Sequence, residues 1–125
     1  ATDTSTTSTT FVPGTPEVSV TFTAPPSGRV YVTVYAQCEA ASPSTAYCGF
    51  EIRLNNASGS VVVSPSVDVA AVTQDAFFSG STRRKLVTGL TPVTQTYFAR
   101  TMIRTSNGAN AANFFHRAIL VEPAP

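Results

Sequence analysis

The clearest pattern in the chain is a strict alternation of apolar and polar residues over positions 28–38. Because successive side chains of a β-strand point to opposite faces, one face of this segment is apolar and the other is polar. The polar face also carries Tyr31 and Tyr35, which are large aromatic residues. The pattern predicts a β-strand with one core face and an aromatic face that needs a cover. The predicted core face consists of Val30, Val32, Val34, Ala36 and Cys38.

Shorter stretches of the same alternation follow, separated by segments rich in Gly, Pro, Ser and Asn. These residues favour turns or end a strand, and no stretch has a helical period of apolar positions. About eight to ten strands separated by turns are typical of an all-β antiparallel sandwich, and we expect one of jelly-roll type. The predicted strands cover residues 17–23, 28–38, 48–54, 61–63, 85–88, 94–105 and 113–122, with a weakly patterned region at 66–82.

The two cysteines lie on the apolar sides of consecutive predicted strands, with loop residues 39–47 between them. If these strands form an antiparallel hairpin with Cys38 opposite Cys48, then Val34 faces Ile52 and the other apolar positions also pair. The register that aligns the thiols therefore aligns the core, and it predicts a Cys38–Cys48 disulfide. Such a bond would indicate an extracellular or virion-surface setting. The alternative is a pair of buried free thiols.

Several predicted strands are substantially apolar on both faces, although only one face can be buried inside a sandwich. The second face needs loops, a ligand or neighbouring subunits as a cover. Aromatic residues and arginine are enriched in subunit interfaces, which favours association around a threefold axis. A ligand-binding face of tyrosines is a further possibility. The candidate interface residues are Tyr31, Tyr35, Phe98, Met102, Phe114 and His116.

Composition limits the classes of partner. The chain of 125 residues is 12% charged, about half the usual fraction for a soluble domain, which favours packing against other copies. A net charge of +1 does not predict nucleic-acid binding. The basic run Arg83–Lys85 is interpreted as solubilising a loop or strand edge. No apolar run is long enough for a membrane helix, so we expect no membrane insertion.

The first residues form a polar Thr/Ser-rich stretch followed by a turn-rich one. We interpret residues 1–15 as a linker from something upstream, and residues 16–125 as a single β-sandwich domain. Loops on a rigid sandwich usually carry recognition, so we expect partner contacts at 39–47, 66–82 and 106–112. The candidate contact residues are Ser42, Ser44, Tyr47, Asn107 and Asn110.

Motifs for chemistry are absent from the sequence. No nucleophile elbow, phosphate loop, dinucleotide fingerprint or clustered metal-ligand spacing occurs. The single histidine, His116, lies in the last predicted strand, and a triad with Asp68 or Asp75 would need an elbow that the chain lacks. We therefore predict a non-enzymatic protein without a metal or cofactor.

One short piece resembles fibronectin type III domains. The stretch 89–97, with Leu90, Pro92 and Tyr97, is similar to the turn before strand F in that family. The resemblance implies a tyrosine corner at Tyr97. The chain lacks the tryptophan that the family places in its core.

A second resemblance spans nearly the whole chain. Residues 28–34, 50–56, 86–92 and 115–123 look like the strands and turns of C1q/TNF-like jelly rolls, although Val93 stands where that family has a glycine. More narrowly, residues 22–30, 83–92 and 119–123 resemble the C-terminal domains of actinobacterial phage minor tail or fibre proteins. This resemblance implies a trimeric head domain on a virion appendage that contacts a host-surface glycan or protein. The alternatives are a capsid decoration protein, a secreted fibronectin-like accessory or carbohydrate-binding module, and a small hydrolase around His116.

Overall fold

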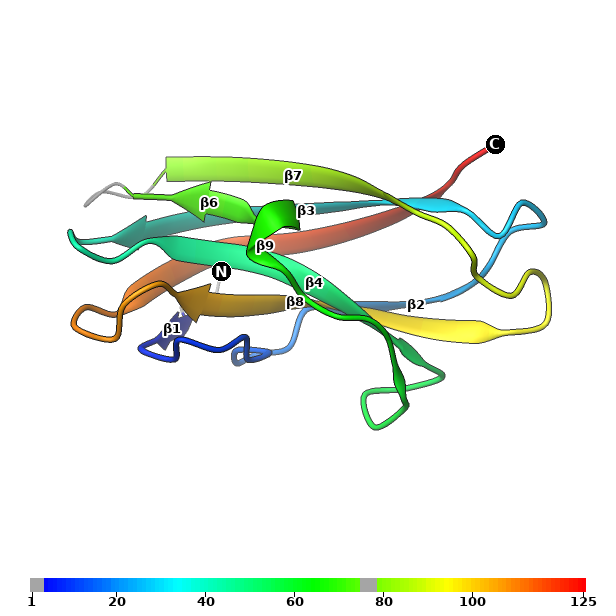
Figure 1. The fold of residues 1–125 in the computed structure, drawn as a ribbon, viewed down its shortest axis with the longest axis horizontal. Helices are drawn as coiled ribbons and strands as arrows, with labels where there is room; N and C mark the ends of the chain where they lie inside the picture. The colour runs from blue at the N-terminus through cyan, green and yellow to red at the C-terminus, as the bar shows by residue number, and fades with distance from the viewer. Residues whose placement is uncertain (1–3, 75–78) are drawn as a thin grey trace.

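The structure, a computed structural model, describes residues 4–74 and 79–125 as a sandwich of two antiparallel β-sheets (Figure 1). Sheet A has the strand order β1-β9-β3-β7, and sheet B has the order β2-β8-β4-β5, with β6 also paired to β4. The prediction of an all-β antiparallel sandwich is confirmed. The elements are β1 (Thr4–Thr6), β2 (Ser19–Thr23), β3 (Val30–Ala40), β4 (Ala46–Leu54), β5 (Val61–Val63), the 3₁₀ turn η1 (Val67–Val69), β6 (Ala71–Thr73), β7 (Ser79–Val87), β8 (Thr96–Thr105) and β9 (Ala112–Pro123).

The strand pairing is nested along the chain. The first strand, β1, pairs with the last, β9; β2 pairs with β8; and β3 pairs with β7. At the centre of this nest, β4 pairs with the nearby β5 and β6. The chain crosses between the two sheets at most of its connections, so apart from β4, β5 and β6 the neighbouring strands of a sheet are far apart in sequence.

Strand β3 is the centre of sheet A, with β7 on one side and β9 on the other. Its burial alternates at every residue, as predicted from the sequence. All five predicted core residues are at most 2% exposed, and they face the buried residues of sheet B. A strand with neighbours on both edges and a β-branched apolar face suits this position, because Val packs well on a pleated surface.

The predicted hairpin between β3 and β4 is wrong. Cys38 on β3 pairs with Ser79 and Phe114, whereas Cys48 on β4 pairs with Ile103 and Ala71. The two strands belong to opposite sheets, and both cysteines are buried free thiols rather than the predicted disulfide. The sequence pattern misleads here because alternation identifies an apolar face but does not say whether two such faces lie side by side or across a core.

Strand β9 contains a β-bulge that the alternation pattern did not predict. Between the pairs Tyr35–Ala118 and Gln37–Phe115, β3 has one residue and β9 has two, His116 and Arg117. His116 adopts a positive φ of 49° there. The extra residue reverses the inward and outward positions of the strand on either side.

Because of the bulge, one residue that was predicted for the subunit interface lies in the core instead. Phe114, which lies before the bulge, is 0% exposed in the core. Its neighbour Phe115 is on the outer face instead, opposite Gln37. After the bulge the inward positions are Ile119 and Val121. Phe114 is therefore a core residue and not part of a subunit interface.

Much of the segment expected to be a linker is bound to the sandwich. Residues 4–6 form β1, and the main chain of Ser8, Val12 and Val18 accepts hydrogen bonds from β8. Phe11 lies over Gly49 on the outer face of sheet B, where a Cβ on the glycine would be 3.3 Å from the Phe11 ring. This segment therefore continues, beyond β2, the main-chain pairing along the same edge of β8. It also covers part of the outer face of sheet B.

The turns at the end near the C-terminus fit closely against one another. Gly28 has φ of +68°, and a Cβ there would lie 2.6 Å from the carbonyl oxygen of Leu90. Only glycine combines this backbone conformation with so close an approach. Beside it, the main-chain N–H of Thr91 donates to the Tyr97 hydroxyl at 2.8 Å. The expected tyrosine corner is thus present.

Candidate functional site

The outer face of sheet A is a broad surface with aromatic and aliphatic side chains. The register aligns Leu86, Tyr31 and Glu122 in one row across β7, β3 and β9. The next rows are Arg84–Thr33–Leu120 and Thr82–Tyr35–Ala118. Leu120 is 54% exposed and Leu86 is 36% exposed, so this face is only partly covered by its own side chains.

Both tyrosines of this face are held in place by β7. The Tyr35 ring lies against Gly80, where a Cβ would come within 2.9 Å of the Tyr35 hydroxyl. The guanidinium of Arg84 lies over the Tyr31 ring, 3.8 Å from its centroid. Each tyrosine is half-buried as a result. The two rings form fixed contact surfaces, which suits recognition because little conformational freedom is lost on binding.

The six predicted interface residues lie in three different places. Tyr31, Tyr35 and the exposed His116 belong to sheet A, outside the core. Phe98 and Met102 are on the outer face of sheet B, opposite Arg53 and Gly49 on β4. The sixth residue, Phe114, lies in the core. The structure therefore puts Tyr31 and Tyr35 together on sheet A. It puts the predicted β8 residues, Phe98 and Met102, on the other sheet.

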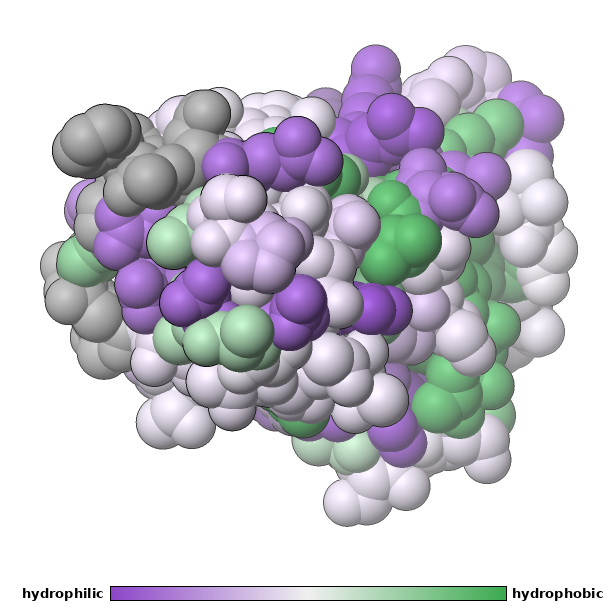
Figure 2. All heavy atoms as spheres, turned by 60° about the vertical axis from the view of Figure 1, so that its left-hand side comes forward, coloured by the Kyte–Doolittle hydropathy of each residue, from purple (hydrophilic) through white to green (hydrophobic). Residues whose placement is uncertain are grey.

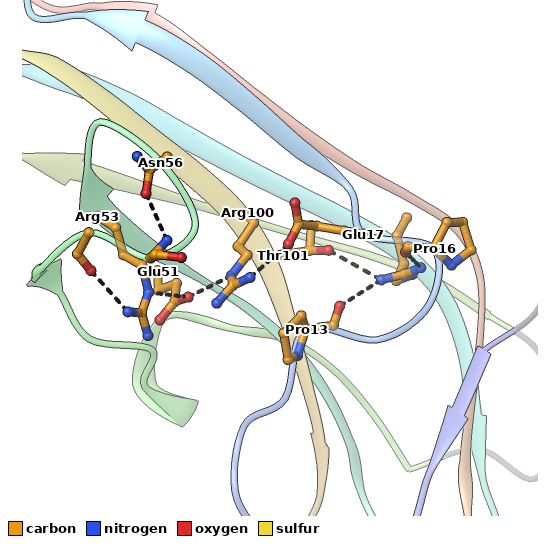
Figure 3. A network of polar contacts seen from close by, with 11 residues as sticks. Pro13, Pro16, Glu17, Glu51, Arg53, Asn56, Arg100 and Thr101 are labelled. Atoms are coloured by element: carbon orange, nitrogen blue, oxygen red, sulfur yellow. Dashed lines mark hydrogen bonds and ion pairs between the residues drawn. The ribbon is translucent and has the colours of Figure 1, made fainter.

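The outer face of sheet B carries a chain of ion pairs (Figure 3). Glu51 Oε2 accepts from Arg53 Nε at 2.9 Å and from Arg100 Nε at 2.6 Å. Arg100 also reaches Glu17 at 2.7 Å, which ties the segment before β2 to the sheet. Burial by itself raises the pKa of Glu51, but hydrogen bonds from Arg53 and Arg100 outweigh it and hold that pKa below its usual value. This network is structural, because its charges neutralise one another.

Further along sheet B, Arg104 lies between two aromatic rings. Its guanidinium is 5.6 Å from the Phe11 ring centroid and 5.5 Å from that of Tyr47. Met102, only 5% exposed, pairs with Gly49 next to them. Residues 8–18 and these side chains cover this half of sheet B, which distinguishes it from the outer face of sheet A.

Two of the predicted contact loops meet at one end of the sandwich. The Ser44 hydroxyl donates to the carbonyl of Asn107 at 2.7 Å, and Asn110 Nδ2 donates to that of Ser42 at 3.1 Å. Thr45 N–H donates to the Ser106 hydroxyl at 2.8 Å. Residues 41–45 and 106–110 are thus joined into one surface, to which we refer as the loop end.

The loop end is polar and slightly hollowed. A hollow of about 370 Å³ is lined by Ser42, Pro43, Ser44, Thr45 and Gln74. Figure 2 brings this end forward and shows it covered mainly by pale and purple residues. Ser42 and Asn107 are exposed, whereas Ser44 is buried and Tyr47 lies outside the loops, on β4. The third predicted loop, 66–82, forms η1, β6 and the start of β7, and its residues 75–78 lie outside the described part of the chain.

An arginine that the sequence analysis did not single out clamps the N-terminal segment. Arg117 Nη1 donates to the carbonyl of Pro13 at 3.1 Å and to the Thr101 hydroxyl at 3.5 Å, and Nη2 donates to the carbonyl of Pro16. Burial lowers the pKa of Arg117. The bulge at His116 turns this side chain inward, and no local sequence signal marks a bulge of this kind.

The structure shows the surroundings of His116, the one histidine considered for catalysis. His116 makes no hydrogen bond there to a serine, threonine or carboxylate side chain, and its ring neighbour is Phe115 at 6.4 Å. Within the same residues, no three of His, Cys, Asp and Glu gather as a metal site would require. The proposed triad partner Asp75 lies outside the described residues.

The two thiols are expected to be unreactive in the folded protein. Burial raises the pKa of Cys38 from 9.0 to about 12, and burial together with the nearby Cys38 does the same for Cys48. Because only the thiolate reacts, its fraction falls about a thousandfold at neutral pH. Titration with a disulfide reagent at about pH 8 should find no rapid thiol in native protein and two thiols per chain after denaturation without reductant. Two rapid native thiols would contradict the burial, and none after denaturation would reveal the disulfide instead.

No protein-family model matches the chain, and no curated protein or solved structure matches it. No helix among the described residues is long and apolar enough to cross a membrane.

Proposed function

We propose that this chain is a non-enzymatic attachment and assembly domain, the head of a virion appendage such as a phage tail fibre or minor tail protein. It associates as a homotrimer through the outer face of sheet A and contacts a host-surface glycan or protein through its loops. The observation that carries the proposal is the tyrosine-bearing outer face of sheet A. A soluble domain does not usually leave an apolar sheet face exposed unless that face contacts something.

The strand order supports a jelly roll as the architecture. Nested pairing of the first strand with the last and the second with the next to last is what a jelly roll requires, because it is a long hairpin folded over on itself. An immunoglobulin-like sandwich instead places its first two strands next to each other in one sheet. C1q/TNF-like heads use a jelly roll, and the sequence resemblance to them spans nearly the whole chain.

The contrast between the two outer faces supports the choice of interface. Sheet B is covered by residues 8–18 and by the Glu17–Arg100–Glu51–Arg53 network. Sheet A offers Tyr31, Tyr35 and the exposed Leu120 within three adjacent rows. Tyrosine and leucine side chains in rows rimmed by Arg84 and Glu122 have the composition of an interface core with a charged rim.

The loop end supports the attachment part of the proposal. Loops 41–45 and 106–110 brace each other through side-chain hydrogen bonds, so they present a fixed polar surface. Exposed hydroxyl and amide groups on such a surface, including those of Ser42 and Asn107, can donate to and accept from a glycan or a protein main chain. The same domain could serve as a capsid decoration protein, which would use the same interface.

Replacing both Tyr31 and Tyr35 by serine is expected to convert the trimer to a monomer. Both rings are half-buried on the outer face, so their removal deletes interface area but leaves the core side of β3 unchanged. Light scattering coupled to gel filtration measures the mass of each form, and circular dichroism checks that the sandwich is retained. The matched control is Val61→Ser with Val62→Ser, which removes two exposed apolar side chains from β5 of sheet B.

A wild-type chain that is monomeric at all concentrations would overturn the assembly proposal. That result would favour a monomeric secreted accessory module, which would share with fibronectin type III domains only the hydrogen bond between Thr91 and Tyr97, since the strand order differs. Equal loss of mass in the Val61/Val62 control would place the interface on sheet B.

A further inference from the structure

The basic residues of β7 differ from the arginines on the outer face of sheet B that are held in ion pairs. On sheet B, Arg53 and Arg100 are paired with Glu51 and Glu17. No ion pair involves Arg83, Arg84 or Lys85 within the described residues. All three side chains are exposed, so β7 presents three adjacent positive charges to solvent.

Two of these cations are held by neutral groups. Arg83 Nη2 donates to the main-chain oxygen of Asp68 at 2.9 Å, and Arg84 stacks on the Tyr31 ring. A carbonyl or an aromatic face positions a guanidinium without cancelling its charge. On the outer face, the acid in the Tyr31 row is Glu122 on β9, two strands away from β7 and therefore roughly 10 Å distant.

The position of β7 leaves this segment accessible. It is the last strand of sheet A, and its first residues are covered by β6, through the bond from Val72 N–H to the Ser81 hydroxyl at 3.1 Å. Beyond this contact, residues 82–86 are all exposed. Strand alternation puts Arg84 on one face of the edge, and Arg83 and Lys85, roughly 7 Å apart, on the other.

We propose that the edge of β7 at Arg83, Arg84 and Lys85 binds an acidic polysaccharide, one whose repeating units carry carboxylate or sulfate groups. Arg83 and Lys85 on one face of the edge and Arg84 on the other can contact successive anionic groups of a chain that follows the edge. The Tyr31 ring beside Arg84 adds apolar area for a sugar ring. This binding site is separate from the loop end. Arg84 and Tyr31 also belong to the outer face of sheet A, so the proposed trimer would compete with a sugar chain for these two residues, whereas Arg83 and Lys85 are on the other face of the edge.

The charge distribution favours a polysaccharide over a nucleic acid. Tight duplex binding usually neutralises roughly six to ten phosphates over a broad basic surface. This chain has a net charge of +1, and two of its other arginines, Arg53 and Arg100, are neutralised in ion pairs. Three cations on one short stretch of edge strand fit a few units of an acidic sugar chain.

Calorimetry with a heparin hexasaccharide tests the proposal. The wild-type chain is expected to bind with an affinity that falls as NaCl is added. The variant Arg83→Gln, Arg84→Gln, Lys85→Gln should bind about tenfold or more weakly, because exposed ion contacts are individually modest and add over three sites. The charge-preserving variant Arg83→Lys, Arg84→Lys is the matched control and should bind more tightly than the glutamine variant, because it keeps all three charges, but more weakly than wild type, because lysine lacks the planar guanidinium that stacks on Tyr31. Both variants keep an exposed polar edge and the core residues of sheet A.

Three results would overturn the proposal: no binding of heparin by the wild type at low salt, equal binding by the glutamine variant, or tighter binding of a DNA oligonucleotide of matched charge. The first two would leave the basic run with the single role of preventing edge-to-edge pairing of sheets, which a charge of either sign could fulfil. Neutral dextran of similar length serves as the control for uncharged sugar contacts. None of these outcomes bears on the oligomeric state, which is measured separately by light scattering.

Discussion

Replacing Phe114 by alanine is expected to lower the free energy of unfolding by about 3–5 kcal/mol, the usual cost of deleting a buried phenylalanine. Phe114 is 0% exposed and pairs with Cys38 at the centre of sheet A. The surrounding residues belong to strands with neighbours on both edges, so they can close the cavity only in part. Urea unfolding followed by circular dichroism measures the change.

The matched control is Phe115→Ala, one residue further along. Phe115 is half-buried on the outer face, opposite Gln37, and its loss should cost clearly less than that of Phe114. The comparison tests the bulge directly, because an unbulged strand would place Ile119 and Phe115 on the same face, inside. A larger loss for Phe115 than for Phe114 would show that the bulge is misplaced.

Glu51→Gln is the second large expected effect, a loss of about 2–3 kcal/mol at neutral pH. The Glu51 side chain is 3% exposed and accepts from both Arg53 and Arg100. Without its charge, two neighbouring guanidinium groups repel each other, and Arg100, which is 11% exposed, keeps only Glu17 as a partner. Urea unfolding at pH values from about 7 down to about 3 measures both the loss and its pH dependence.

The pH dependence has a definite sign. Because the pKa of Glu51 lies below its usual value of 4.5 in the folded chain, the carboxylate contributes stability above pH 4.5 that is lost as the pH falls through the folded-state pKa. The difference between wild type and Glu51→Gln should therefore shrink on acidification.

Glu17→Gln is the control for Glu51. Its side chain is 36% exposed and touches Arg100 alone, so it should cost less than about 1 kcal/mol. A pH-independent difference between wild type and Glu51→Gln would show that the carboxylate is not ionised through these contacts. Equal losses for the two variants would show that burial does not strengthen the pairing.

The sequence contains much of the local information about the strands. The alternation over residues 28–38 correctly predicted β3 and its five core residues, and the pattern over 94–105 correctly predicted the strand β8. The turn residues around Gly28 and Asn107 correctly marked strand ends. These predictions succeed because the period of side chains along a strand depends on the strand alone.

Part of the candidate site also follows from the sequence. Tyr31 and Tyr35 are on an outer face because their neighbours on β3 are in the core. The loops 39–47 and 106–112 were predicted to carry contacts, and the hydrogen bonds of Ser44 and Asn110 join them at one end of the sandwich. The β8 residues Phe98 and Met102 were assigned to the same interface, but they lie on the other sheet.

The sequence by itself thus determined where the long strands β3, β4 and β8 run and which side of β3 is apolar, whereas β1, β6 and the first part of β7 were not predicted. Only the tertiary structure decided which strands are neighbours. It put β3 and β4 in opposite sheets, so that Cys38 and Cys48 are free thiols, and it inserted the bulge at His116 that buries Phe114 and turns Arg117 toward Pro13. The physical reason is that the apolar face of a strand is buried against the opposite sheet whichever strands are its neighbours, so the pattern of one strand does not select its partners. The choice of partners depends on the packing of the whole chain.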